Sequence, residues 1–246
     1  MKAVILAAGK GTRMGALTDE LPKPMLPVEG RPILDHIISG IAAQGVREFC
    51  LITGWKAEFI EQHFGDGSAL GLSITYARQE VQDGTGKAPE LAKCFVDDDP
   101  FLLTYGDILV RPKTYATMVE RFDQGEFSGL ITVTPGEDVT KGAINFFDDQ
   151  FCLRKIVEKP SVDQLDQLRA DGWLKEGEPM WYNAGIYIFH PIVFEHTARL
   201  QKSPRGEYEL TDAIATMIDA NEPIAGAKTE GRWIDIRDPD VLESLG

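Results

Sequence analysis

Two short stretches near the start of the chain combine basic side chains with glycine or proline. The first, Ala8-Gly9-Lys10-Gly11-Thr12-Arg13, follows an apolar run at residues 4–8. Glycines after a strand let backbone N–H groups approach an anion closely, and Arg13 adds a charged fork suited to phosphate. The second, residues 21–27, carries Lys23 between two prolines. These residue types predict phosphate binding, although the glycines alone would also suit an ordinary tight turn.

Two better-known phosphate-binding patterns do not fit the glycine stretch. Gly9, Gly11 and Gly15 resemble a loosened dinucleotide-binding fingerprint, but that motif needs an immediate helix and an acidic residue closing the second strand. Here the prolines of residues 21–27 forbid a continuous helix. The second expected strand ends in Ile52-Thr53-Gly54, which contains no acidic residue to bind a ribose. A P-loop is also excluded, because no Gly-Lys-Ser/Thr follows at the required spacing.

Strand-like and helix-like segments alternate around these stretches. Continuous apolar runs are typical of parallel strands buried on both faces, and apolar residues at helical spacing indicate the helices between them. We expect strands at 4–8, 49–53, 73–77, 101–104, 143–147, 152–158, 180–189 and 232–236, and helices at 33–41, 57–64, 88–95, 162–170, 210–220 and 239–245. The pattern predicts an α/β fold: a doubly wound, mostly parallel but mixed sheet in a single domain.

The composition of the chain limits its expected cellular location and the kinds of molecule that it could bind. With 246 residues and 43% apolar content, the chain can bury one large core, and no apolar run approaches the roughly 20 residues that cross a membrane. The three cysteines are odd in number and lie in apolar stretches, so we expect reduced thiols and a cytoplasmic protein. A net charge of −14 disfavours nucleic acid as a partner.

The glycine stretch at residues 3–14, followed by Leu21-Pro22-Lys23-Pro24-Met25-Leu26-Pro27, resembles the signature of the sugar nucleotidylyltransferase family. The resemblance implies a Rossmann-like nucleotidyltransferase domain over residues 1–246, with a nucleotide-binding half at 1–110 and a sugar-phosphate-binding half at 111–246. It also implies a magnesium-dependent enzyme that joins a nucleoside triphosphate to a sugar-1-phosphate and releases pyrophosphate.

The same resemblance assigns roles in the nucleotide-binding half. Ala8, Gly9, Gly11, Thr12 and Arg13 would cradle the triphosphate, and Lys23 would approach its α-phosphate. Gln79, followed by Gly84 and Thr85, resembles the base-recognition segment of uridylyl- and thymidylyltransferases. A carboxamide can read uracil or thymine because it offers both a donor and an acceptor.

Two aspartates resemble the magnesium ligands of the family. Asp107 ends the segment Thr104-Tyr105-Gly106-Asp107 after an apolar run, and Asp235 ends Trp233-Ile234-Asp235. Two carboxylates suit Mg²⁺, which keeps several waters and phosphate ligands. Residues 236–239 depart from the family, because they replace its glycine-containing turn. We expect a shared sheet to bring Asp107 and Asp235 to one ion.

On the sugar side, Glu158-Lys159-Pro160 resembles a family element in which the glutamate accepts sugar hydroxyls and the lysine meets the sugar phosphate. Gly142 and Asn183 match neighbouring elements of that pocket. The stretch Glu209-Leu210-Thr211-Asp212 also occurs in relatives, and its carboxylates are equally typical of helix capping.

The expected chemistry needs no covalent protein nucleophile, because a phosphate oxygen ionised near pH 7 can attack the α-phosphorus. Catalysis is then positioning and charge neutralisation by Arg13, Lys23, Asp107 and Mg²⁺. We favour UTP or dTTP, while Thr104–Asp107 also resembles cytidylyltransferases. A non-catalytic paralogue that binds nucleotide sugars is the alternative from another class. Glucose, N-acetylmuramate and heptose phosphates remain open, as does the oligomeric state.

Overall fold

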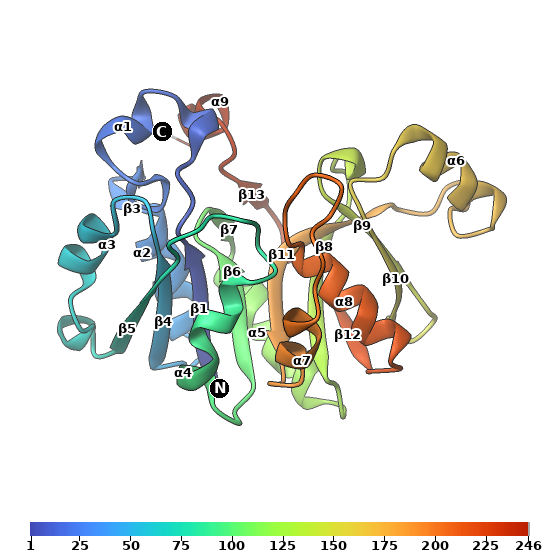
Figure 1. Ribbon diagram of the computed structural model, residues 1–246, viewed down its shortest axis with the longest axis horizontal. Helices are drawn as coiled ribbons and strands as arrows, with labels where there is room; N and C mark the ends of the chain where they lie inside the picture. The colour runs from blue at the N-terminus through green and yellow to red at the C-terminus, as the bar shows by residue number, and fades with distance from the viewer. Residues whose placement is uncertain (246) are drawn as a thin grey trace.

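One mixed sheet of nine strands organises the part of the chain that the computed structural model describes, residues 1–245. Gly246, the last residue of the predicted domain, lies outside the described residues. The strands run in the order β10-β9-β11-β6-β1-β4-β5, with β8 paired to β11 and β12 to β8 (Figure 1). Their bounds are β1 Lys2–Ala7, β4 Glu48–Thr53, β5 Ser73–Arg78, β6 Phe101–Tyr105, β8 Gly129–Thr134, β9 Ala143–Phe147, β10 Leu153–Glu158, β11 Trp181–Phe189 and β12 Ile224–Lys228.

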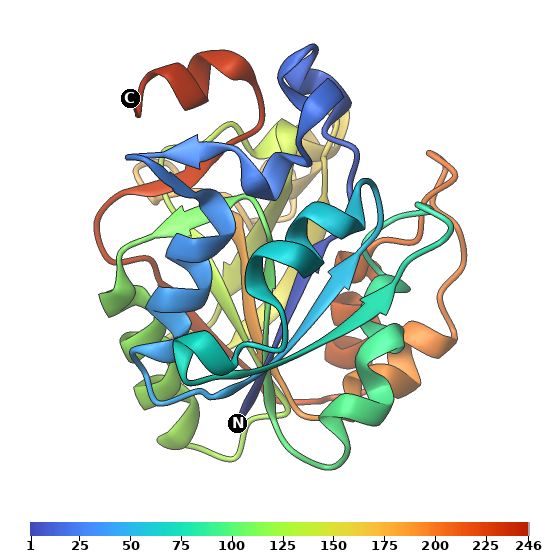
Figure 2. The ribbon, with the colours of Figure 1, turned by 90° about the vertical axis from the view of Figure 1, so that its left-hand side faces the viewer.

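Helices cover both faces of the sheet. They are α1 Leu17–Glu20, α2 Ile33–Ala42, α3 Ala57–Phe64, α4 Lys93–Val96, α5 Pro112–Asp123, α6 Val162–Ala170, α7 Val193–Ala198, α8 Leu210–Asp219 and α9 Pro239–Glu243. Figure 2 looks onto the edge at β5, with α2 and α5 on one side and α4, α7 and α8 on the other. Two separate apolar clusters correspond to these faces, because successive residues of β1 belong to different clusters: Ile5 to the first and Val4 to the second. The predicted doubly wound α/β domain is confirmed.

The first half of the sheet is parallel, and its strand order creates the place for a ligand. β1 pairs with β4 on one side and β6 on the other, all in the same direction. The chain thus leaves β1 toward β4 and β5 and later returns to the opposite side of β1 at β6. In open α/β sheets, ligands bind at the carboxyl ends of the strands beside such a switch point.

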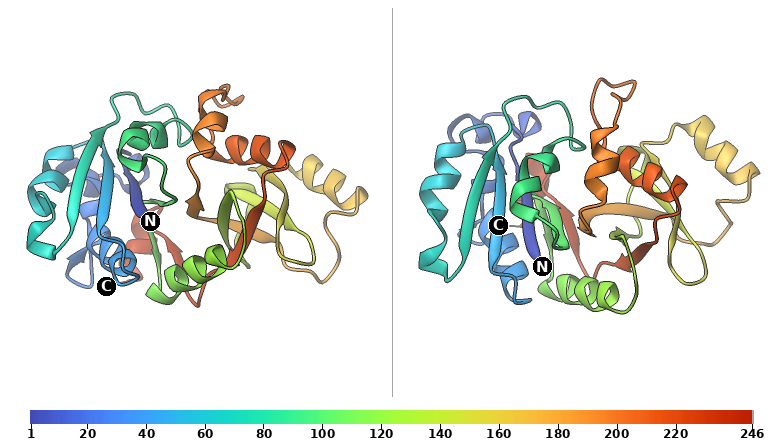
Figure 3. Two further views of the ribbon diagram at one scale, coloured as in Figure 1. Left: turned by 90° about the horizontal axis from the view of Figure 1, so that it is seen from below. Right: turned by 60° about the horizontal axis from the view of Figure 1, so that its bottom comes forward.

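The second half adds antiparallel strands to β6. The long strand β11 pairs with β6, β8 and β9, and β9 forms a hairpin with β10. Helix α6 projects from this end of the molecule (Figure 3) and begins with a capping box formed by Ser161 and Gln164. The predicted hairpin, long strand and acidic helix all occur, whereas α5, α7, β8 and β12 are elements that the sequence did not predict.

Asp235 reaches Asp107 by another route than expected. β13 (Trp233–Asp235) pairs antiparallel with β7 (Ile108–Val110) in a separate two-stranded sheet, and a further ribbon joins β2 (Pro27–Val28) to β3 (Arg31–Pro32). The pairing of Asp235 with Ile108 still places its carboxylate next to Asp107. The expectation of a shared sheet is thus correct for these short strands and wrong for the main sheet. Within residues 1–245, no helix is both long and apolar enough to span a membrane.

Helices α2 and α5 approach closely at Gly40, which predicts a sensitivity to one methyl group. A Cβ at Gly40 would lie 2.9 Å from Cε2 of the fully buried Tyr115. Overpacking of this kind costs about 1–3 kcal/mol, against roughly 1 kcal/mol gained from the better helix propensity of alanine. Gly40→Ala should therefore lower the melting temperature by several degrees in calorimetry. The exposed Ser39→Ala should change it little, and an unchanged Gly40→Ala protein would contradict this packing.

Candidate active site

A cavity of about 530 Å³ opens at the carboxyl ends of β1 and β6, beside the switch point of the sheet. Both halves of the chain contribute to it. Every residue predicted from the sequence to bind substrate or metal lines this cavity: Ala8, Gly9, Gly11, Thr12, Arg13, Lys23, Gln79, Gly84, Thr85, Asp107, Gly142, Glu158, Lys159, Asn183 and Asp235. The structure therefore brings together positions that are far apart in the sequence, while their individual roles stay predictions.

The glycine stretch forms a compact loop at the end of β1, which is the phosphate-binding loop predicted from the sequence. Gly11 has a left-handed backbone, with φ of 65°, and a Cβ there would meet Lys23 Cβ at 3.0 Å. Only glycine lets the loop pack this tightly on the buried Lys23 without strain. The loop and the proline-rich stretch thus form one unit, which carries Arg13 and Lys23 to the same side of the cavity.

Asp107, Asp235 and Lys23 form a charge cluster at the edge of this unit. The Lys23 ammonium contacts Asp107 Oδ2 at 2.5 Å, and the Ile236 N–H donates to the Asp107 carbonyl, which holds the strand of Asp235 alongside. Burial and the negative charge of Asp107 raise the pKa of Asp235, while Lys23 opposes the rise. When both carboxylates are ionised, the single charge of Lys23 does not neutralise them, and the remaining negative charge favours a bound cation.

The segment after β5 forms the side of the cavity assigned to the base. Gln79 Nε2 donates to the Gly84 carbonyl at 3.5 Å, so the carboxamide lies within its own loop beside the cavity. Gly84 bridges to Tyr208, and a Cβ at Gly84 would lie 2.3 Å from the Tyr208 carbonyl oxygen. The Thr85 hydroxyl accepts from the Leu210 N–H at 3.3 Å. The proposed base-reading segment is therefore joined to the loop that precedes α8.

Glu158 and Glu209 dominate the side of the cavity assigned to the sugar. Arg205 bridges them, with Nη2 at 3.4 Å from Glu158 Oε1 and 2.6 Å from Glu209 Oε1, and Thr211 donates to Glu158 Oε2 at 3.1 Å. Burial, followed by repulsion from Glu209, raises the pKa of Glu158. Lys159 has a left-handed backbone and donates its N–H to the Gly142 carbonyl at 2.7 Å. This side offers acceptors for hydroxyl groups and, at Lys159, a cation for phosphate.

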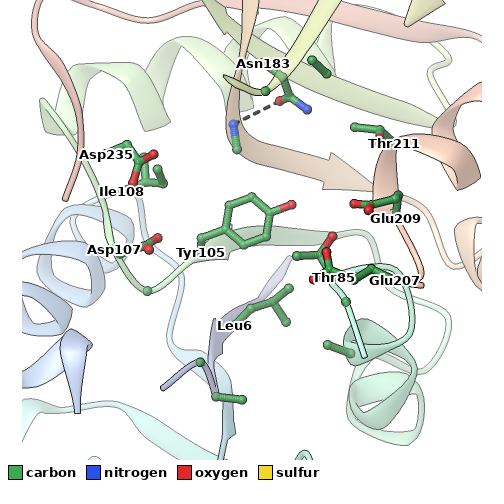
Figure 4. Close-up of a pocket in the computed structure, with 18 of the residues that line it drawn as sticks. Leu6, Thr85, Tyr105, Asp107, Ile108, Asn183, Glu207, Glu209, Thr211 and Asp235 are labelled. Carbon is green, nitrogen blue, oxygen red and sulfur yellow. Dashed lines mark hydrogen bonds between the residues drawn. The ribbon is translucent and has the colours of Figure 1, made fainter. Parts of the chain in front are cut away.

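Tyr105 lies in the middle of the cavity. In Figure 4 its ring separates Asp107 and Asp235 from Glu207 and Glu209. Burial raises the pKa of Tyr105 to about 12, so its hydroxyl stays protonated and can donate at neutral pH. The ring packs so closely on Gly185 that a Cβ there would lie 2.7 Å from Tyr105 Cδ2.

Asn183 is held next to this ring by two hydrogen bonds. Its Nδ2 donates to the Tyr187 hydroxyl at 2.8 Å, and its Oδ1 accepts from the Gly185 N–H at 3.1 Å. The two bonds fix the orientation of the carboxamide without a substrate. Asn183 therefore presents a fixed polar surface to the sugar side of the cavity.

Several residues that line the cavity received no binding or catalytic role from the sequence, although some of them belong to the motifs described above. They are Gln82, Tyr105, Lys141, Tyr182, Glu207, Glu209, Thr211 and Trp233. The capping interpretation of Glu209 is wrong: Glu209 is the N-cap residue of α8, but its carboxylate accepts from Arg205 and Ser203 and gives the helix no side-chain cap. The occurrence of Glu209-Leu210-Thr211 in relatives could have indicated a site, but the sequence could not show where these side chains point.

An α/β sheet with a switch-point cavity and a glycine loop after its first strand is typical of nucleotide-binding proteins. The sequence model described as "Nucleotidyl transferase" matches residues 2–244, and the chain belongs to this family.

Two relatives come from Haloferax volcanii. The UTP–glucose-1-phosphate uridylyltransferase AglF is 30% identical over 98% of this chain and 93% of its own length. The low-salt glycan biosynthesis nucleotidyltransferase Agl11 is 34% identical over 99% of this chain but only 65% of its own length. The bifunctional protein GlmU of Methanococcus aeolicus is 36% identical over 99% of this chain, which spans 53% of that relative.

A crystal structure from Bacillus anthracis, in complex with a sucrose, supports the fold. Its protein is proposed to be a glucose-1-phosphate thymidylyltransferase and superimposes with a TM-score of 0.84 at 24% sequence identity. The alignment covers 100% of this chain and 93% of that one. The fold described above is therefore the fold of that protein.

The raised pKa of Glu158 predicts a pH-dependent stability. Because the folded-state pKa is above the unfolded value, the ionised carboxylate destabilises the fold, and stability is lost as the pH rises through the folded-state pKa. Glu158→Gln should thus raise the melting temperature at pH 8, and the difference should shrink toward pH 4. The exposed Glu176→Gln serves as control, and a lower melting temperature for Glu158→Gln at pH 8 would refute the interpretation.

Proposed function

We propose that this protein transfers a nucleotidyl group from a nucleoside triphosphate to a sugar-1-phosphate, giving a nucleotide sugar and pyrophosphate. The main support is that one cavity receives the phosphate-binding loop with Arg13 and Lys23 as well as Glu158 and Lys159 from the second half. A protein that binds only a nucleotide or only a sugar phosphate would need one of these sets. We divide the domain into a nucleotide-binding half, residues 1–110, and a sugar-phosphate-binding half, residues 111–246.

The residues divide the chemical work. Backbone N–H groups of Gly9–Thr12 and the Arg13 guanidinium would hold the triphosphate, and Lys23 would neutralise charge at its α-phosphate as pyrophosphate leaves. Lys159 would bind the incoming phosphate, whose oxygen forms the new bond to the α-phosphorus. Glu158, Asn183 and Gly142 would fix the sugar, so that the attacking oxygen is aligned opposite the leaving group.

The charge cluster fits a magnesium ion. Asp107 and Asp235 repel each other, and a cation between them would relieve that repulsion. Within residues 1–245 no group of three or more His, Cys, Asp or Glu side chains could hold a metal ion, so phosphate oxygens and water would supply the other ligands here. Mg²⁺ is typically held by one or two carboxylates together with phosphate oxygens and water. Bound there by Asp107 and Asp235, it would neutralise phosphate charge.

We propose UTP or dTTP as the nucleotide. Gln79 supports this preference through its carboxamide, and the name of the relative AglF includes UTP. The competing cytidylyltransferase assignment rests on Thr104–Asp107, and a non-catalytic paralogue remains the alternative from another class. We also propose a cytoplasmic location, because Cys50, Cys94 and Cys152 are free thiols in the described chain.

A screen of four nucleoside triphosphates against sugar-1-phosphates, read by pyrophosphate release, tests this function. We expect release with UTP or dTTP and a hexose-1-phosphate, with rejection of other bases by up to about 10⁴ when their hydrogen-bond partners are left unpaired. Faster turnover with CTP would overturn the base preference alone. If nucleotide sugars bind but no pair gives pyrophosphate, the protein is the non-catalytic paralogue.

The proposed metal site predicts a shared loss of activity. Asp107→Ala and Asp235→Ala should each lower kcat on the order of 10²–10³, because each removes negative charge from a site that holds a dication. The double variant should lose much less than the product, since residues that serve one ion act together. Excess Mg²⁺ should partly restore either single variant, whereas the exposed Asp163→Ala should behave as wild type. Normal kcat and magnesium dependence in Asp235→Ala would remove that residue from the site.

A further inference from the structure

The turn between β4 and α3, residues Gly54, Trp55 and Lys56, lies against the outside of the phosphate-binding loop. The Trp55 N–H donates to the Ala8 carbonyl at 3.1 Å, where the loop leaves β1. Gly54 approaches the same residue so closely that a Cβ would lie 2.7 Å from the Ala8 oxygen. This turn therefore holds the first residue of the loop.

The same turn also contacts α1, the short helix that follows the loop. The Trp55 indole N–H donates to the Thr18 carbonyl at 3.3 Å, and the Lys56 ammonium donates to the Asp19 carbonyl at 2.5 Å. Thr18 is buried, and its hydroxyl lies 3.3 Å from the Gly11 carbonyl and 3.2 Å from that of Gly15. A change at Trp55 can thus reach the glycines through Thr18.

Lys10 supplies a third contact from within the loop. Its ammonium lies 4.5 Å from the centre of the Trp55 ring, within the range of a cation–π interaction. Gly9 and Gly11, on either side of Lys10, line the cavity. The two glycines have little conformational preference of their own, so an external contact at the residue between them limits how their N–H groups can turn.

We propose that Trp55 and Lys10 are positioning residues for the triphosphate: together they brace the loop from outside and keep its N–H groups directed at the phosphates. The inference rests on the proposed function for its ligand, a nucleoside triphosphate. It does not involve the base or the sugar. Lys56, with φ of 51°, adopts a left-handed backbone that non-glycine residues rarely keep unless their surroundings fix it, as expected of a rigid support.

Kinetics and binding test the brace in the intact protein. Lys10→Met and Trp55→Ala should raise the KM for the nucleotide, and the Kd for its magnesium complex in calorimetry, about tenfold, because a misplaced loop binds the phosphates less well. The KM for the sugar phosphate should stay within about twofold. Lys10→Arg should restore binding, and Trp55→Phe, which keeps a ring without the indole N–H, should be intermediate.

Lys228→Ala is the matched control. Lys228 is exposed and lies over another tryptophan, Trp181, at 4.8 Å, outside the candidate site. Lys228→Ala removes the same charge and the same type of contact as Lys10→Met, but away from the loop, so the KM for the nucleotide should be unchanged. A rise equal to that of Lys10→Met would mean that net charge, and not the brace, controls affinity, and would overturn the proposal.

Hydrogen exchange of the protein without substrates separates this proposal from the function. Amides of residues 9–15 should exchange about tenfold faster in Lys10→Met and Trp55→Ala than in wild type, with β4 unchanged. Unchanged exchange and unchanged nucleotide KM would overturn the brace and leave the function standing. If wild type neither binds nor turns over any nucleotide, the function fails, and the exchange rates alone decide whether the brace exists. Should Trp55→Ala not fold, the exposed Lys10→Met still gives the answer.

Discussion

Asp107 and Asp235 bring two negative charges together at the edge of the sheet, and several other features of the structure depend on that placement. Like charges in a half-buried setting repel strongly, so they stay together only when the backbone is held and a cation is near. Lys23 supplies the nearby cation, and the pairing of β13 with β7 supplies the backbone. The Trp233 indole, which donates to the Ala184 carbonyl at 2.8 Å, anchors β13 on β11. The edge that carries Asp107 and Asp235 is thus connected directly to β11, the strand that carries Asn183.

The two halves of the sheet contribute different kinds of groups to one cavity. A parallel half ends in loops at one edge, which suits phosphate recognition by backbone N–H groups. The antiparallel half turns back along the same edge through β11, so carboxylates from β10 and from the start of α8 face the phosphate-binding loop across one cavity. A purely parallel continuation would have placed a crossover helix after each strand and left less room for the long loop before α8.

The sequence predicted the parts of this site that depend on local pattern. Apolar runs located β1, β4 and β6, and residues that directly follow such strands, such as Gly9 and Asp107, must lie at the edge of the sheet. The pattern of residues 232–236 predicted a strand, but the role of Asp235 came from the family resemblance alone. That it pairs with β7, outside the main sheet, depends on long-range contacts.

Other features could not be read from the sequence because they depend on side-chain direction. Glu209 looked like a helix cap, and only the path of residues 201–208 shows that its carboxylate turns to Arg205 instead. Trp55 carried no signal at all, since an aromatic residue after a strand is usually part of the core. The contacts of Trp55 join segments that are distant along the chain, whereas Arg205 lies only four residues before Glu209 and the direction of its side chain decides the contact.

The bridge between Gly84 and Tyr208 has a thermodynamic consequence for ligands on either side of the cavity. It joins, through backbone atoms, the segment that carries Thr85 to the loop that carries Arg205 and Glu209. A ligand that orders one of these segments therefore removes part of the freedom that the other would lose on binding. Such linkage is reciprocal: whatever affinity a ligand on one side adds for a ligand on the other, the second adds equally for the first.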